Sequence, residues 1–157
     1  MQEIEPGSND IALRSFSTRE ILNHGANWFL WLGLLSIINS LLVYYFGLQN
    51  LPFAFALTQW VDGTTGPLTA EGWSPPLQTV GLVMNLLIAA VFASFAYFAR
   101  HGNDKVFVFG IFLYAIDAML SIGLRDFWGF GFHLIGLFFL FKGLLASRHL
   151  RENATTY

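Results

Sequence analysis

The sequence predicts an all-α integral membrane protein, a four-transmembrane-helix antiparallel bundle with its N and C termini in the cytoplasm. Of its 157 residues, 55% are hydrophobic and only 11% are charged, whereas an average soluble domain carries about 25% charged residues. Each of four apolar runs is close to the length of about 20 residues that a helix needs to cross a bilayer. These runs are residues 27–46, 77–98, 106–124 and 129–147.

The direction of the spans follows from the connections and the basic residues. Short connections join the last three runs, and short connections place neighbouring helices antiparallel. Seven of the eight Lys and Arg residues fall on one side of this arrangement, and only Arg125 falls on the other. Because cytoplasmic segments carry the excess of Lys and Arg, we expect a multi-pass protein of the inner (plasma) membrane.

The segments outside the transmembrane domain, residues 27–147, are expected to be two cytoplasmic tails. In the tail 1–26, Ser17 followed by Glu20 has the spacing of a capping box, which predicts a short amphipathic, interfacial helix. His24 and Gly25 are expected to end that helix before the membrane. Residues 148–157 form the C-terminal tail.

The outer loop, residues 47–76, has a composition of its own. It begins with an apolar and aromatic stretch, LPFAFALTQWVDG, and continues with several glycines and prolines. The apolar part is too short to span a membrane. Trp60 and Trp73 are of the residue type that is enriched at membrane interfaces. The loop is therefore predicted to contain an interfacial or re-entrant segment over the outer mouth of the bundle.

One strongly polar residue lies inside each predicted span: Asn39, Asn85, Asp117 and His133. With a rise of about 1.5 Å per residue, all four lie roughly 6–12 Å from the outer ends of their helices. Ionisable residues in a membrane are costly and usually face the bundle interior, where they have partners. Because the four depths agree, we expect these side chains to meet in one polar layer.

The helical repeat adds further residues to this layer. Residues three or four apart share a face, which places Tyr114 and Ser121 with Asp117, and Gln78 with Asn85. The same faces carry small residues such as Gly81, Gly129 and Gly136, which favour close helix packing. The sequence thus predicts a ligand-binding site formed by Asp117, His133, Asn85, Asn39, Tyr114, Ser121 and Gln78.

Several classes of function lack the residues they require. The chain has no cysteine, which excludes thiol chemistry and thiolate metal sites. Catalytic zinc normally has three protein ligands, and the layer offers only Asp117 and His133 as good ones. No nucleophile motif or cofactor motif is present, so we expect no metal and no cofactor, and an enzyme is disfavoured. No basic cluster indicates nucleic acid.

The hypothesis that we favour is binding of a small molecule, a lipid headgroup or an ion in the polar layer. The expected partners are the lipid bilayer, such a ligand, and a second copy of the chain. Alternatives are a structural or accessory subunit of a membrane complex, with the layer as interhelical glue, and a proton-coupled transporter subunit. Size and topology are similar to those of many small bacterial four-span proteins, but no motif indicates a family.

Overall fold

The computed structural model describes residues 6–46, 55–65 and 75–155, and all of its regular structure there is helical. The side chains of residues 6–12, 14, 62–65, 75–78 and 154–155, which include Gln78, lie outside the description. The helices are α1 (Pro6–Phe46), α2 (Ala56–Thr65), α3 (Pro75–Arg100), α4 (Asp104–Gly123) and α5 (Phe127–Thr155).

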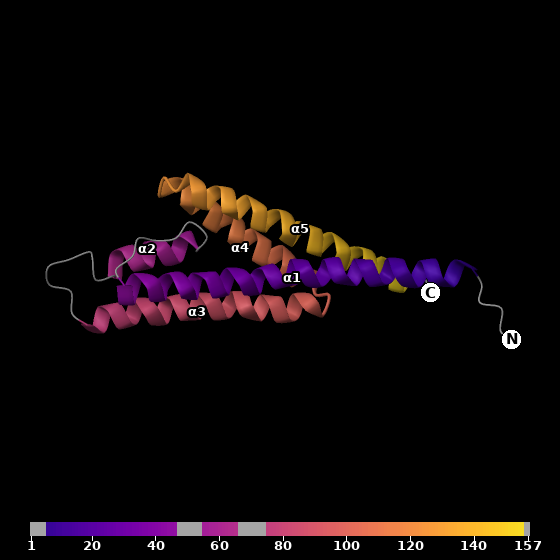
Figure 1. Cartoon of the computed structure of the whole chain (residues 1–157), viewed down its shortest axis with the longest axis horizontal. Helices are drawn as coiled ribbons and strands as arrows, with labels where there is room; N and C mark the ends of the chain where they lie inside the picture. Colours follow the sequence, from indigo (N-terminus) through magenta and orange to yellow (C-terminus); the bar gives the residue numbers. More distant parts are fainter. Residues whose placement is uncertain (1–5, 47–54, 66–74, 156–157) are drawn as a thin grey trace.

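The four long helices run along one common direction, and the short α2 lies at one end of them (Figure 1). Both chain termini lie at the opposite end, so we call the two ends the α2 end and the termini end. Helix α1 packs against α3 and α5, and α4 packs mainly against α5. Although α3 and α4 follow each other in the chain, they contact each other much less, and α2 fits against both.

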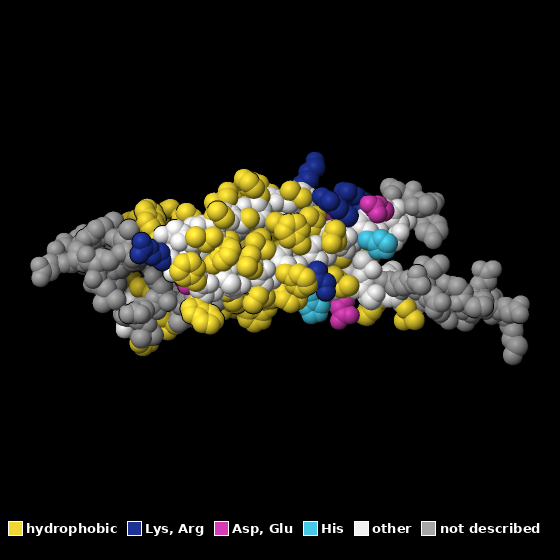
Figure 2. Space-filling model, turned by 90° about the horizontal axis from the view of Figure 1, so that it is seen from above, with side chains coloured by type: hydrophobic (Ala, Val, Ile, Leu, Met, Phe, Trp, Pro, Cys, Tyr) yellow, Lys and Arg dark blue, Asp and Glu magenta, His cyan; other side chains and the backbone are white. Residues whose placement is uncertain are grey.

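The predicted four membrane spans are confirmed in the part of the chain that the structure describes. Four of its helices are long and apolar enough to cross a membrane, with mean hydropathy between 1.7 and 2.1. On the face that Figure 2 shows, large apolar side chains cover the middle of the molecule, and most of the visible basic side chains lie toward the termini end. The protein is therefore a multi-pass membrane protein by composition and length, while the cytoplasmic position of its termini stays a prediction.

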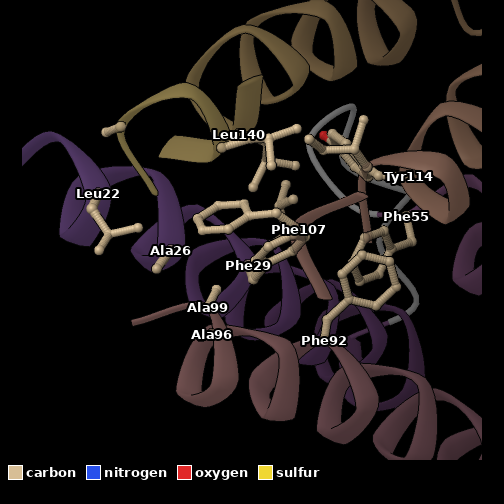
Figure 3. Close-up of a cluster of buried hydrophobic side chains, with 14 residues drawn as sticks. Leu22, Ala26, Phe29, Phe55, Phe92, Ala96, Ala99, Phe107, Tyr114 and Leu140 are labelled. Carbon is tan, nitrogen blue, oxygen red and sulfur yellow. The ribbon is translucent and has the colours of Figure 1, made fainter. Parts of the chain in front are cut away.

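Aromatic rings fill the interior of the bundle from the level of Phe29 and Phe107 to the start of α2. The ring of Phe29 packs against those of Phe92 and Phe107, with centroids 6.2 and 5.8 Å apart. Phe55, just before α2, packs against Phe92 at 4.2 Å and against Tyr114 at 6.0 Å. Figure 3 shows these rings beside the small Ala side chains that let the helices approach. The tilted and edge-on arrangements are the ones that aromatic pairs favour.

The N-terminal tail differs from the prediction. No separate short helix ends at His24 and Gly25, because α1 is one continuous helix of 41 residues. Gly25 does not end a helix; it allows α1 to pack closely against α5. A Cβ atom at Gly25 would lie 2.5 Å from the Cα of Gly143, so α1 and α5 touch through their backbones at this point. Such contacts between small residues are typical of membrane helices.

The two short connections are fixed by local capping. Asn103 caps α4, and its side chain accepts a hydrogen bond from Val106 N at 3.4 Å. Asp126 caps α5 in the same way, accepting from Gly129 N at 2.8 Å. Both residue types are preferred helix N-caps because their side chains satisfy main-chain N–H groups that have no partner within the helix. These caps define the starts of α4 and α5 directly after the two short connections.

Candidate functional site

The centre of the site is the N-terminus of α2, which is held by two of the long helices. Phe55 N donates to Ser36 Oγ of α1 at 3.0 Å. Ala56 N and Leu57 N donate to the two carboxylate oxygens of Asp117 on α4, at 3.0 and 2.9 Å. The first N–H groups of any helix lack partners within the helix, and a carboxylate is stabilised at this positive end. Asp117 therefore caps a helix that begins 61 residues earlier in the chain.

The sequence around the start of α2 explains why the cap comes from so far away. The residue at the capping position is Phe55, since its carbonyl accepts the first bond of the helix from Gln59 N at 3.0 Å. A Phe side chain cannot accept a hydrogen bond, whereas Ser, Thr, Asp and Asn can. Ser36 and Asp117 supply the missing acceptors from α1 and α4.

His133 on α5 completes the arrangement from the other side of Asp117. Its Nε2 lies 2.7 Å from Asp117 Oδ2, and its Nδ1 lies 2.6 Å from the carbonyl oxygen of Gly129. Because a carbonyl only accepts, Nδ1 must carry a proton. A second proton lies between Nε2 and Oδ2, on the imidazole or on the carboxyl group. In both cases the pair has zero net charge, which suits its almost complete burial.

Tyr114 covers the imidazole ring. The two rings are stacked with centroids 4.8 Å apart and an angle of 21° between their planes. Gly136 makes room for this, because a Cβ atom there would lie 2.8 Å from the Tyr114 ring. The Tyr114 hydroxyl is buried, and no described residue forms a hydrogen bond with it. Tyr114 thus acts on the site through its ring.

The other predicted site residues form further contacts. Asn85 on α3 donates to Ser40 Oγ on α1 at 2.8 Å, and Asn39 is fully buried on α1. Ser121 donates to the main-chain oxygen of Asp117 at 3.4 Å, within α4. Gln78 lies outside the described side chains. The structure therefore joins Asp117 directly to His133, and it ties Asn85 to α1.

An apolar groove lies between α3 and α4, beside this cluster. It has a volume of about 230 Å³, and among the described residues Asp117 is the one charged side chain that lines it. Ile88 and Val91 of α3 form one wall, and Leu113 and Leu120 of α4 form the other. Leu57 and the adjoining Phe55 close it at the α2 end. The groove exists because α3 packs mainly against α1, and α4 packs mainly against α5. The two helices α3 and α4 contact each other only weakly.

Two features limit the chemistry of the site. Among the described residues, no three His, Cys, Asp or Glu side chains gather so that they could hold a metal ion. Toward the termini end, the buried side chains of Phe29, Phe107 and Leu140 fill the interior. These apolar groups offer no hydrogen-bonding path from Asp117 to the other side of the bundle.

Comparisons with protein-family models, with curated proteins and with solved structures found no match to the chain.

Sequence reasoning identified Asp117 and His133 but missed what they hold. Two of the partners of Asp117 are the main-chain N–H groups of Ala56 and Leu57, and no side-chain pattern in the sequence marks a main-chain donor. Ser36 carried a weak signal, since it lies one helical turn before Asn39 and Ser40 and all three are buried. The ligand-binding role of the predicted residues stays a prediction.

Proposed function

We propose that this multi-pass membrane protein binds a small, mostly apolar molecule in the groove between α3 and α4. The observation that carries the proposal is the composition of the groove, whose walls are apolar except for the carboxylate of Asp117. A concave apolar site with a few placed polar groups is the usual form of a small-molecule site.

The size and surroundings of the groove define the ligand class. A volume of about 230 Å³ is below the roughly 300–1,000 Å³ of sites for drug-sized molecules. It suits a small apolar molecule or one chain of an amphipathic lipid. Val91, Ile116 and Leu120, which line the groove, are also exposed on the outer surface of the bundle. The ligand would therefore enter sideways from the hydrocarbon layer of the membrane.

The polar end of the ligand is defined by what Asp117 can still accept. A carboxylate has about four acceptor positions, and three donors occupy it here: Ala56 N, Leu57 N and His133 Nε2. One position on Oδ1 is left for a donor such as a hydroxyl group. The proposed ligand is thus a neutral apolar molecule with one hydroxyl, and a lipid headgroup or an ion is disfavoured.

The test compares two probes that differ only in that donor. Thermal unfolding of the purified protein in detergent is measured with dodecan-1-ol and with its methyl ether. Because a hydrogen bond to a charged group contributes about 1.5–3 kcal/mol, the alcohol should bind about 10-fold to 100-fold more tightly. The substitution Leu113→Trp should fill the groove and abolish the stabilisation by the alcohol.

The matched control is Met119→Trp, on the same helix but 66% exposed on the outer face. It should respond to the alcohol as the parent does. Equal stabilisation by the alcohol and the ether, unchanged in Leu113→Trp, would mean that the probes act through the detergent micelle. That result would contradict the proposal.

One observation favours a second candidate function, that of an accessory subunit of a larger membrane complex. The hydrogen bonds of Ser36, Asp117 and His133 join α1, α4 and α5 to the start of α2 and to one another, as expected if the polar layer only organises the bundle. Extraction in mild detergent followed by size-exclusion chromatography distinguishes the two. A second protein that co-elutes in stoichiometric amount favours the accessory role.

A further inference from the structure

A second pocket lies between α4 and α5, nearer the termini end of α4 than the groove described above. Its volume is about 540 Å³. One side of it is charged and consists of Asp104, Lys105, Arg148 and Arg151. The other side is apolar and consists of Val108, Phe109 and Phe112.

The charged side has an excess of positive charge. Asp104 is buried, accepts a hydrogen bond from the Ser147 hydroxyl and forms an ion pair with Arg151 at 2.6 Å. Lys105 and Arg148 are exposed, and neither has an ion-pair partner among the described residues. Three cations and one carboxylate leave a net charge of +2 at the pocket. Its ligand should therefore be an anion.

The apolar side continues from the charged side along α4. Val108, Phe109 and Phe112 follow Lys105 by three, four and seven residues, so all of them share one face of the helix. The three apolar side chains are 46%, 54% and 59% exposed. Phe112 lies roughly 10 Å deeper along the helix than Lys105. Because α4 spans the membrane, this face runs from the interface into the hydrocarbon layer.

We infer that this pocket binds an anionic phospholipid from the membrane leaflet at the termini end. The phosphate lies between Lys105 and Arg148, and an acyl chain lies along Val108, Phe109 and Phe112. Basic pockets between membrane helices are known binding sites for anionic lipid headgroups, and a guanidinium group binds phosphate through two parallel hydrogen bonds. A free anion would use only the charged side and would leave the apolar side uncovered.

The experiment measures thermal unfolding of the delipidated full chain in neutral detergent. The additions are phosphatidylglycerol, diphosphatidylglycerol, phosphatidylcholine and inorganic phosphate. We expect stabilisation by both anionic lipids, more by the doubly charged one, and none by phosphatidylcholine or phosphate. Each Lys or Arg near a lipid surface changes affinity by about fivefold, so Lys105→Gln with Arg148→Gln should weaken the lipid effect by about 25-fold.

The control is Lys142→Gln, an exposed cation on α5 whose ammonium lies 5.5 Å from the Phe138 ring centroid and outside the pocket. It should keep the full lipid response. Because both substituted side chains are exposed, the double variant without lipid should unfold at the same temperature as the parent. This measurement checks that the variant is folded. Stabilisation by phosphate alone, an equal loss in Lys142→Gln, or a change of oligomeric state in place of lipid binding would each overturn the inference.

Discussion

The substitution Asp117→Asn tests most directly how α2 is held. An amide has one acceptor oxygen where the carboxylate has two, and its nitrogen only donates. If the amide nitrogen takes the position of Oδ2 and donates to His133, the oxygen can still accept from Leu57 N. Ala56 N, which donates to Oδ2 at 3.0 Å, then faces an NH₂ group and loses its acceptor.

The magnitude follows from these bonds. A buried donor without an acceptor costs about 1–3 kcal/mol, and the bond to Leu57 N loses about 1 kcal/mol when its acceptor is no longer charged. The docking of α2 should therefore weaken by about 2–4 kcal/mol. That free energy corresponds to a roughly 30-fold to 1000-fold rise in the population in which α2 is undocked.

Hydrogen exchange followed by mass spectrometry measures this population for a peptide that covers Ala56 and Leu57. Local opening appears as faster exchange in one cooperative unit, so α2 should exchange faster while α1 and α5 stay protected. The control is Asp126→Asn at the start of α5, where Asn is about as good a helix cap as Asp. Unchanged protection of α2 in Asp117→Asn would refute the assignment of Asp117 as its cap.

Two further substitutions test the packing of the bundle. Gly25→Ala places a Cβ atom 2.5 Å from the Cα of Gly143, so overpacking should cost about 1–3 kcal/mol, measured as a lower unfolding temperature in detergent. Gly131→Ala, with nothing within 4 Å, is the control and should be neutral or stabilising by up to about 1 kcal/mol, since Ala is the better helix former. Tyr114→Phe removes a buried hydroxyl that has no described partner but keeps the ring stacked on His133. We therefore expect equal or higher stability in the same assay. A loss of more than about 1 kcal/mol would show that the hydroxyl is hydrogen-bonded.

The spans and their buried faces could be predicted because both follow from local patterns. Hydropathy over about 20 residues identifies a membrane helix, and the spacing of three and four residues identifies the face that turns inward. Tyr114, Asp117 and Ser121 on α4 are all buried, as that spacing predicts. His133 is buried on α5 for the same reason.

The parts that could not be predicted depend on contacts between distant segments. Gly25 followed by apolar residues has the local pattern of a helix end, and the approach of Gly143 explains why a glycine stands there inside a continuous helix. Asp104 lies at the start of a span, where an acid is a common first-turn residue. Its burial between Ser147 and Arg151 depends on the position of α5. No local pattern in the sequence encodes either of these pairings.

The choice of an acid at residue 117 has a physical explanation in this geometry. An ionisable residue in a membrane usually indicates function, because an amide could form interhelical hydrogen bonds at lower cost. Here three donors converge on one side chain, two of them from the start of a helix. An amide oxygen can accept at most two hydrogen bonds, whereas a carboxylate accepts about four. The proton that Asp117 shares with His133 keeps the pair neutral, and the acceptor position that is left over connects this structural role to the proposed ligand.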